Sequence, residues 1–371
     1  LNNLFSIIDL MALCDVRREN AEEKAKIYGI AEVMTMEELA ESRDIELVIN
    51  LTSPDAHYVV IKKMLEFGKH VFSEKTLAVS FEEGRELAEL AKKKGLYLGA
   101  APDTVLGAGL QTARKVIDAG LIGTVTSCFA SINRNQPLNS ESFRFIQKGA
   151  GGAFPMDVGV YYAAALLSLL GPAECVSGFA TQAPLHEKEL LFMEGNRESW
   201  QLEGSNLMTG AVKFKSGALG VLHFNGLSIN REMPKISIYG TEGILEVGDP
   251  NTFNGEVRLL REKGEACVIP FTNGYDGKAA GEMTEFEKMY GHRGVGAAEM
   301  AWAIRRGRLN RCSKEFALHT LEVLCGIDRA SASGENYRMT TEFTFVPLKA
   351  GYYSTTFGDG MRADAERSLV E

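Results

Sequence analysis

The sequence is poor in the residues that metal sites and disulfide frameworks require. It has 6 histidines and 6 cysteines in 371 residues, and no cysteine pair has CxxC spacing or a histidine at metal-ligand spacing. Thiols scattered in this way are expected to stay free in a reducing compartment. The sequence therefore predicts no structural zinc, no other metal ligands and no disulfide framework, and it favours a cytoplasmic protein.

Long apolar runs and clusters of positive charge are also missing. The apolar stretches are interrupted well short of a membrane span, and no polybasic amphipathic segment is present. The 49 acidic residues outnumber the 40 lysines and arginines, so the formal net charge is −9. Because such a surface does not track phosphates, neither a membrane nor a nucleic acid is expected as a partner.

An initiating methionine is absent. The chain opens with Leu1 and runs directly into a strand-like pattern. We therefore expect its true start to lie outside this sequence, which leaves an export signal open as an alternative to the cytoplasm.

Residues 1–101 alternate apolar strands with charged helices. Strands are predicted at residues 7–16, 46–52, 70–73 and 96–101, and helices at 17–28 and 57–67 and from a capping box at Ser80 to Gly95. This alternation is typical of a parallel sheet wound with right-handed crossovers. Ligands bind such sheets at the carboxyl ends of the strands.

Those strand ends carry the residues that we expect to hold a cofactor: Asp15, Asn50, Leu51, Thr52, Glu74 and Lys75. In a dinucleotide-binding fold, a strand-end acid holds the adenine ribose about 20 residues beyond a glycine-rich phosphate turn. Counting back from Asp15 puts that turn, and the first strand, before Leu1. The prediction is an NAD site at Asp15, and the alternative role of Asp15 is a helix N-cap.

Two further strand-end features bear on the ligand. Arg17 and Arg18 could contact a 2′-phosphate, which leaves NADP open, whereas Asp15 would repel that phosphate and favours NAD. Solvated lysines are common, but Lys75 stands at the end of a buried strand, where desolvation is expected to lower its pKa. We interpret Lys75 as functional.

Pro102 interrupts the alternation, so we predict a cofactor domain at residues 1–102 and a second α/β domain at 103–371. A helix at 110–119 and a strand at 124–133 open the second domain. Antiparallel pairs are expected at 207–214 with 218–225, 235–239 with 244–247, and 257–260 with 266–269, before helices at 295–306 and 314–331. These strands predict a large, mainly antiparallel open sheet. Its uncovered face is a natural surface for a homodimer or homotetramer.

The stretch from Gly151 to Tyr162 contains the residues best suited to chemistry. Asp157 and Tyr161 stand four residues apart at the head of the apolar run Val158–Leu170, which is too long for a strand and predicts a buried helix. Taken alone, Asp157 would cap that helix and Tyr161 would be core. With Lys75 on a strand end, the two become the expected wall of a catalytic site.

A polar loop at residues 135–149 precedes this stretch. It contains Phe143 and Arg144, and it fits a mobile lid as well as a plain surface loop. We expect specificity to come from these two residues together with Arg134 and Phe154, and we assign Arg134, Phe154 and Asp157 to substrate binding. His319 lies among apolar residues, so we interpret it as a core histidine rather than a metal ligand.

Several motifs together resemble the Gfo/Idh/MocA family of NAD(P)-dependent oxidoreductases. They are CDV (Cys14–Val16), TSPDAH (Thr52–His57), EKT (Glu74–Thr76), DAGLIG (Asp118–Gly123), GGAFPMDVGVYYAAALLSLLGP (Gly151–Pro172) and YGTEGILEV (Tyr239–Val247). The resemblance implies a Rossmann domain, a second domain with a large open sheet, an oligomer built on that sheet, and bound NAD or NADP. It adds His57 to the cofactor-binding residues and implies sugars, cyclitols or related polyols as substrates.

The sequence departs from the family pattern at two functional positions. EKT stands where the family has EKP, and Tyr161 stands where D-x-G-x-H has histidine, as in some other members. A tyrosine needs help to act as a base near neutral pH, and a Lys75 ammonium within about 4 to 6 Å would stabilise its phenolate. We predict reversible dehydrogenation with Tyr161 as acid/base, Lys75 as its partner and Asp157 on an adjacent hydroxyl. The alternatives are a cofactor-sensing regulator and an NAD-recycling glycoside hydrolase.

Overall fold

The computed structural model describes residues 5–134, 151, 153–182, 204–228, 235–272, 275–277 and 291–348. The predicted loop at 135–149, with Phe143 and Arg144, lies outside the described residues. Within the described chain, no helix combines the length and the apolar character needed to cross a bilayer. The six cysteines form no disulfide, and no group of three or more His, Cys, Asp or Glu side chains gathers as a metal site among the described residues.

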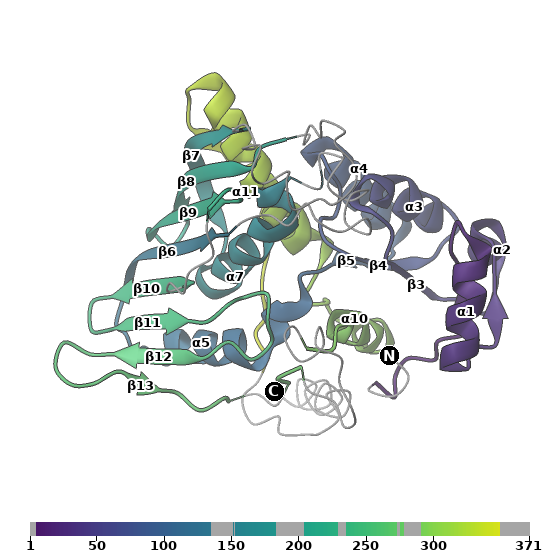
Figure 1. The fold of residues 1–371 in the computed structure, drawn as a ribbon, viewed down its shortest axis with the longest axis horizontal. Coiled ribbons are helices and arrows are strands. Elements are labelled where there is room, and N and C mark those ends of the chain that lie inside the picture. Colours follow the sequence, from purple (N-terminus) through teal and green to yellow (C-terminus); the bar gives the residue numbers. More distant parts are fainter. Residues whose placement is uncertain are drawn as a thin grey trace, which may run out of the picture.

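Parallel strands alternate with helices in the first domain, as predicted (Figure 1). β1 (Ala12–Leu13) pairs with β2 (Glu32–Val33), while β3 (Leu47–Asn50), β4 (His70–Ser73) and β5 (Leu98–Ala100) form a second parallel sheet. The intervening helices are α1 (Arg18–Tyr28), α2 (Met36–Glu41), α3 (Pro54–Glu66) and α4 (Phe81–Lys94). The first predicted strand is much shorter than expected, and β2 and α2 were not predicted.

The helix boundaries follow the local signals in the sequence. α1 and α4 end at Gly29 and Gly95, both with φ of 67°, a left-handed conformation that glycine adopts without a Cβ penalty. The side chain of Ser80 accepts a hydrogen bond from the backbone N of Glu83 at 3.3 Å and so starts α4. The predicted ends of both helices are therefore confirmed.

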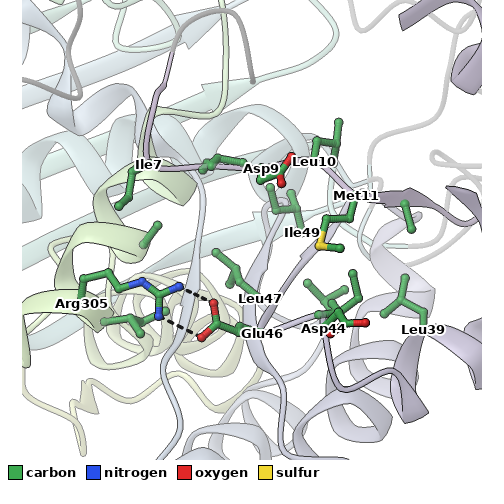
Figure 2. A pocket seen from close by; sticks show the side chains of 16 residues that line it. Ile7, Asp9, Leu10, Met11, Leu39, Asp44, Glu46, Leu47, Ile49 and Arg305 are labelled. Carbon is green, nitrogen blue, oxygen red and sulfur yellow. Dashed lines mark hydrogen bonds and ion pairs between the residues drawn. The ribbon is translucent and has the colours of Figure 1, made fainter. Parts of the chain in front are cut away.

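A gap separates β1, at the edge of one parallel sheet, from β3, at the edge of the other. A cavity of about 220 Å³ fills this gap, and Ile7, Met11, Leu47 and Ile49 are among the apolar side chains that line it (Figure 2). In a doubly wound sheet of strand order 3-2-1-4-5-6, the strand that leads into the glycine-rich turn occupies this position. No described residue forms a strand in this gap.

A nine-stranded mixed sheet forms the second domain, in the order β13-β12-β11-β10-β6-β9-β8-β7-β14. Its strands are β6 (Val125–Asn133), β7 (Ala173–Thr181), β8 (Leu207–Phe214), β9 (Leu219–Asn225), β10 (Ile236–Gly240), β11 (Ile244–Val247), β12 (Val257–Leu260), β13 (Cys267–Val268) and β14 (Tyr337–Arg338). Among the described strands of this sheet, only β6 and β9 pair in parallel. The predicted large, mainly antiparallel sheet is confirmed.

Helices cover one face of this sheet, and no described helix covers the other. α5 (Ala108–Asp118), α7 (Val160–Leu170) and α11 (Lys314–Ser333) pack on the inner face (Figure 1). Because strand residues alternate between faces, the outer face retains apolar side chains. Phe179 is 80% exposed and Leu219 is 59% exposed. The open apolar face that the sequence predicted is therefore present.

The last part of the chain contributes to both domains. α10 (Val295–Arg306) returns to the parallel sheet, where Arg305 forms an ion pair with Glu46 (Figure 2). α11 lies on the large sheet, and its fully buried His319 accepts a hydrogen bond through Nε2 from the backbone N of Ala173 at 3.0 Å. The interpretation of His319 as a hydrogen-bonded core residue is confirmed.

Candidate active site

Lys75 connects the two domains. It follows β4, and its Nζ donates hydrogen bonds to the Asp157 carboxylate at 2.5 Å and to the Asp157 carbonyl at 2.7 Å. The side chains are 14% and 25% exposed, so the ion pair is shielded but still reachable from solvent. The Lys75–Thr76 peptide bond is cis. The cluster joins a strand end of the first domain to the start of the apolar helix of the second.

The chain around Asp157 has a wider helical turn than the sequence indicated. Residues Pro155–Gly159 form a π-helical turn, and the regular helix α7 begins only at Val160. The Asp157 carboxylate binds Lys75 and makes no cap hydrogen bond, so the capping alternative is wrong. The Tyr161 ring lies with its centroid 5.8 Å from Lys75 Nζ. The structure thus brings together the three residues that we predicted to be catalytic.

Arg293 is a fourth member of this cluster, and sequence reasoning missed it. The guanidinium carbon lies 5.6 Å from the centroid of the Tyr161 ring and 5.3 Å from that of Phe253. Its Nη2 donates to the backbone O of Asn251 at 2.7 Å and to its Oδ1 at 2.8 Å. An isolated arginine before a helix has no local pattern, so no signal in the sequence could have identified it.

Burial and neighbouring charges set the protonation of the cluster. Burial acts to lower the pKa of Lys75, but the charges of Asp157, Tyr161 and Glu74 outweigh burial and raise that pKa above its ordinary value. The predicted lowering of the Lys75 pKa is therefore wrong. The side chain remains an ammonium near neutral pH.

Burial also dominates at Tyr161 and raises its pKa to about 12, although Lys75 and Arg293 act in the opposite direction. The sequence predicts that the Lys75 ammonium stabilises the phenolate. Its charge does lower the pKa of Tyr161, but by less than the loss of water around the phenol raises it. Tyr161 is a neutral phenol at rest.

The polar residues at the ends of β3 and β4 bind mainly each other. Asn50 donates through Nδ2 to the Ser73 hydroxyl at 3.1 Å, and its Oδ1 accepts from the Thr52 hydroxyl at 2.8 Å. The ring nitrogens of the fully buried His57 lie 2.6 Å from the Thr76 carbonyl and 3.0 Å from the Thr52 carbonyl. Asn50 and His57 therefore shape the backbone of the strand-end loops rather than face a ligand with their side chains.

Other predicted cofactor residues face solvent at the same edge. Leu51 is 72% exposed, and the backbone N of Glu74 donates to the Asn50 carbonyl at 2.8 Å. Asp15 and Arg17 are also exposed, and Asp15 Oδ1 accepts a hydrogen bond from the Arg17 backbone N at 2.8 Å. Because Arg17, not Asp15, is the N-cap of α1, the alternative role of Asp15 is wrong.

These positions fit part of a dinucleotide. The exposed Asp15 carboxylate at a strand end could accept hydrogen bonds from ribose hydroxyls, and Lys75 and Tyr161 would lie toward the reacting end. The described residues do not include a glycine-rich cradle for the two phosphates. The described residues therefore suit the adenine ribose and the nicotinamide of the cofactor better than they suit its two phosphates.

The predicted substrate residues Arg134 and Phe154 pack on one another. Arg134 follows β6, and its guanidinium carbon lies 5.8 Å from the centroid of the Phe154 ring. Its Nε is buried and has no hydrogen-bond partner within the described chain. Phe154 is fully buried, so the direct substrate contact that we predicted for it is not supported. Its ring supports Arg134 instead.

Comparison with known families agrees with this architecture. Residues 1–101 match the oxidoreductase family with an NAD-binding Rossmann fold, and residues 110–246 match the GFO/IDH/MocA C-terminal domain. The chain belongs to the Gfo/Idh/MocA oxidoreductase family. Both halves of the family architecture are present, in the expected order.

Individual relatives have low sequence identity to this chain. An uncharacterized oxidoreductase of Schizosaccharomyces pombe is 32% identical over 136 residues, which are 36% of this chain and 37% of that protein. The first curated relatives are matched over only 37% to 46% of their own length. The 1,5-anhydro-D-fructose reductase of Ensifer adhaerens is 25% identical over 263 residues, 70% of this chain and 74% of that enzyme.

Among solved structures, levoglucosan dehydrogenase in complex with NADH and levoglucosan has a TM-score of 0.73 with this chain. The match covers 90% of each chain at 18% sequence identity. At that identity the likeness shows the fold alone.

Proposed function

We propose that this oxidoreductase transfers a hydride between a nicotinamide cofactor and a CH–OH carbon of a sugar, cyclitol or related polyhydroxylated compound. The observation that carries the proposal is the Lys75–Asp157 ion pair, which lies beside Tyr161 and joins the cofactor domain to the second domain. Family membership supports the reaction type. The names of the anhydrofructose reductase and the levoglucosan dehydrogenase support a carbohydrate substrate.

The chemistry requires a proton transfer that accompanies the hydride. When bound, the nicotinamide accepts or returns that hydride at its C4 atom. Tyr161 would donate its phenolic proton to the substrate oxygen in reduction and take a proton from the hydroxyl in oxidation. Because burial raises its pKa to about 12, the phenol is already protonated for reduction. The arrangement thus favours Tyr161 as a general acid in carbonyl reduction.

Lys75 and Asp157 have complementary tasks in this proposal. The Lys75 ammonium would donate a hydrogen bond to the reacting oxygen and stabilise the negative charge that develops there. The carboxylate of Asp157 would accept a hydrogen bond from a neighbouring hydroxyl and so orient a polyol. Arg134, whose guanidinium packs on the ring of Phe154, would bind another part of the substrate.

We infer that NAD is the preferred cofactor. The exposed carboxylate of Asp15 suits two ribose hydroxyls and would repel a 2′-phosphate. Arg17 is also exposed and keeps NADP as the second candidate. Dissociation constants for NADH and NADPH, measured by fluorescence with the wild type and Asp15→Asn, would decide. Tighter NADPH binding by the wild type would contradict the inference.

The catalytic assignment is tested with the variants Tyr161→Phe and Lys75→Met. The probes are 1,5-anhydro-D-fructose with NADH or NADPH, levoglucosan with NAD or NADP, and a panel of sugars and cyclitols. Loss of the proton-transfer group is expected to lower kcat about 10² to 10⁴-fold. The matched controls lie on α3: Tyr58→Phe removes a hydrogen bond to Glu86, and Lys63→Met removes an ion pair with Glu37. Near-normal rates in both active-site variants would contradict the catalytic roles assigned to Tyr161 and Lys75.

The same assay separates the other two candidate functions. Net change in free NADH indicates a dehydrogenase or reductase. Hydrolysis of a glycoside without NADH accumulation would instead indicate a cofactor-recycling hydrolase. Tight NAD binding with no turnover of any probe would indicate a cofactor-sensing regulator.

We further propose a homodimer, or a homotetramer built from it, through the open face of the large sheet. Neighbouring strands place Phe129, Val221 and Ala211 in one row on that face, with Leu219 and Phe179 in adjacent rows. Exposed apolar side chains in neighbouring rows of a sheet favour association. Sedimentation velocity should show an oligomer for the wild type and a monomer for Leu219→Lys. A monomeric wild type at micromolar concentration would contradict the proposal.

A further inference from the structure

Two cationic groups from distant parts of the chain approach the ring of Tyr161. Lys75 follows β4, and its Nζ lies 5.8 Å from the ring centroid. Arg293 immediately precedes the N-cap of α10, and its guanidinium carbon lies 5.6 Å from the same centroid. A cation within about 6 Å attracts the negative face of an aromatic ring, and it attracts a phenolate more strongly.

The two cations differ in how much of their charge is already compensated. Lys75 forms an ion pair with Asp157 at 2.5 Å. Arg293 forms no ion pair within the described chain, since its hydrogen bonds go to the uncharged carbonyl and amide oxygens of Asn251. The buried carboxyl group of Asp103 interacts electrostatically with Arg293, and its Oδ2 accepts hydrogen bonds from the backbone N of Gly294 and of Gly296, both at 3.1 Å. Lys75 thus has a carboxylate in direct contact, whereas Arg293 has none among the described residues.

Arg293 is also fixed in place relative to α7. The backbone N of Asn251, its partner, donates to Asp249 Oδ1 at 2.9 Å, and the hydroxyl of Tyr162 donates to that same oxygen at 3.3 Å. Tyr162 is fully buried and adjoins Tyr161 in the helix. One hydrogen-bond network thus links the Arg293 guanidinium to α7, the helix that carries the Tyr161 ring.

We propose that Arg293 is a positioning residue that orients the Tyr161 ring and stabilises its phenolate form, which leaves Lys75 free to polarise the substrate oxygen. This inference rests on the proposed role of Tyr161 as acid/base. Tyr161 must lose its proton when the enzyme oxidises an alcohol. We therefore expect alcohol oxidation to depend on Arg293 more than carbonyl reduction does.

Each charged group near Tyr161 either raises or lowers the pKa of its phenol. Burial raises its pKa first, Lys75 and Arg293 lower it, and Glu74 and Asp157 raise it. Removing the Arg293 charge while leaving the other three groups in place should raise the pKa by about 1 to 2 pH units, the usual effect of one close opposite charge. The sign is opposite to that expected on removal of Asp157.

The experiment reads this titration directly. A fluorinated tyrosine, which is a more acidic phenol, is incorporated at position 161, and its ¹⁹F shift is followed against pH without cofactor. Arg293→Gln is expected to raise the midpoint by about 1 to 2 pH units, and Arg293→Lys by clearly less because the charge is retained. Asn251→Ala keeps the charge but releases the guanidinium, so it should give an intermediate midpoint and serves if Arg293→Gln does not fold.

A kinetic measurement on the same variants completes the test. With levoglucosan and NAD, Arg293→Gln should lower kcat about 10-fold or more with little change in KM. Because Tyr161 acts as the base in oxidation, the limb of the profile on which kcat rises with pH should move to higher pH. Unchanged midpoints and unchanged kcat in Arg293→Gln would overturn the inference. If Tyr161→Phe retains normal turnover while the ¹⁹F midpoint still depends on Arg293, the proposed function has failed and the electrostatic contact has not.

Discussion

Replacement of Gly159 by alanine should disturb the site through packing alone. Gly159 ends the π-helical turn that carries Asp157, and it lies against the ring of Phe224 in β9. A Cβ at this position would lie 2.6 Å from Phe224 Cδ2 and 2.7 Å from Cε2. Carbon atoms in contact are normally about 3.5 to 4.0 Å apart, so the turn or the ring must move by roughly 1 Å.

The ring has little room to move. Phe224 is fully buried, and its ring packs edge-on against Tyr162 with centroids 6.2 Å apart. Overpacking of this kind costs about 1 to 3 kcal/mol, while the better helix propensity of alanine returns about 0.5 to 1 kcal/mol. The net loss in the free energy of unfolding should be about 0.5 to 2 kcal/mol. A shift of roughly 1 Å in Asp157 and Tyr161 should lower kcat/KM about 10²-fold.

Urea unfolding and steady-state kinetics with the same probes measure both effects. The double variant Gly159→Ala/Phe224→Leu removes the colliding ring atoms, and it should recover part of the stability and activity lost in the single variant. Wild-type stability and kcat/KM in Gly159→Ala would refute the reasoning. A double variant no better than the sum of the two single changes would show that this contact is not the cause.

Three further predictions concern buried charge. Glu299 is fully buried, and its Oε1 lies 2.9 Å from Arg311 Nη1. Glu299→Gln leaves that arginine without its buried partner charge, so the free energy of unfolding measured in urea should fall by about 3 to 5 kcal/mol. A loss below about 1 kcal/mol would contradict this. Burial lowers the pKa of His319 to about 4, from an ordinary 6.5. The unfolded chain then takes up the proton first, so stability is full above about pH 6.5 and falls toward pH 4 by at most about 3 kcal/mol. Urea titrations across this range should show a flatter dependence for His319→Gln, and an unchanged slope would count against it. Asp157→Asn removes a carboxylate that raises the pKa of both Lys75 and Tyr161, so the alkaline limb of the kcat profile should move to lower pH; a shift to higher pH would contradict the assignment.

Much of the fold was predictable because its signals are local. The apolar runs and capping residues of the first domain define β4 and the ends of α1 and α4. Strand alternation defined β8, β11 and β12 to the residue. The first strand was overextended because apolar residues 7–11 line the cavity between the two parallel sheets without joining a ladder. β2 and α2 are too short to leave a periodic pattern.

The candidate site was predictable in part for the same reason. A polar residue that follows a buried strand, or begins an apolar helix, lies at an element boundary, and this identified Lys75, Asp157 and Tyr161. Arg293 has no such context, because the tight contacts of its segment are made with Asn251 and Phe253, about 40 residues earlier in the chain. The burial of Phe154 likewise depends on strands that fold against it from elsewhere.

The sequence by itself determined most of the succession of elements and the two-domain architecture, and it singled out the three residues that we predict to be catalytic, because periodicity and strand-end position are properties of neighbouring residues. Only the tertiary structure decided how those residues ionise. Burial raises the pKa of Tyr161, Asp157 keeps Lys75 charged, and Arg293 adds a second cation. The pKa of a buried group depends on its loss of water and on its distances to all neighbouring charges. Those distances are set only when the chain has folded.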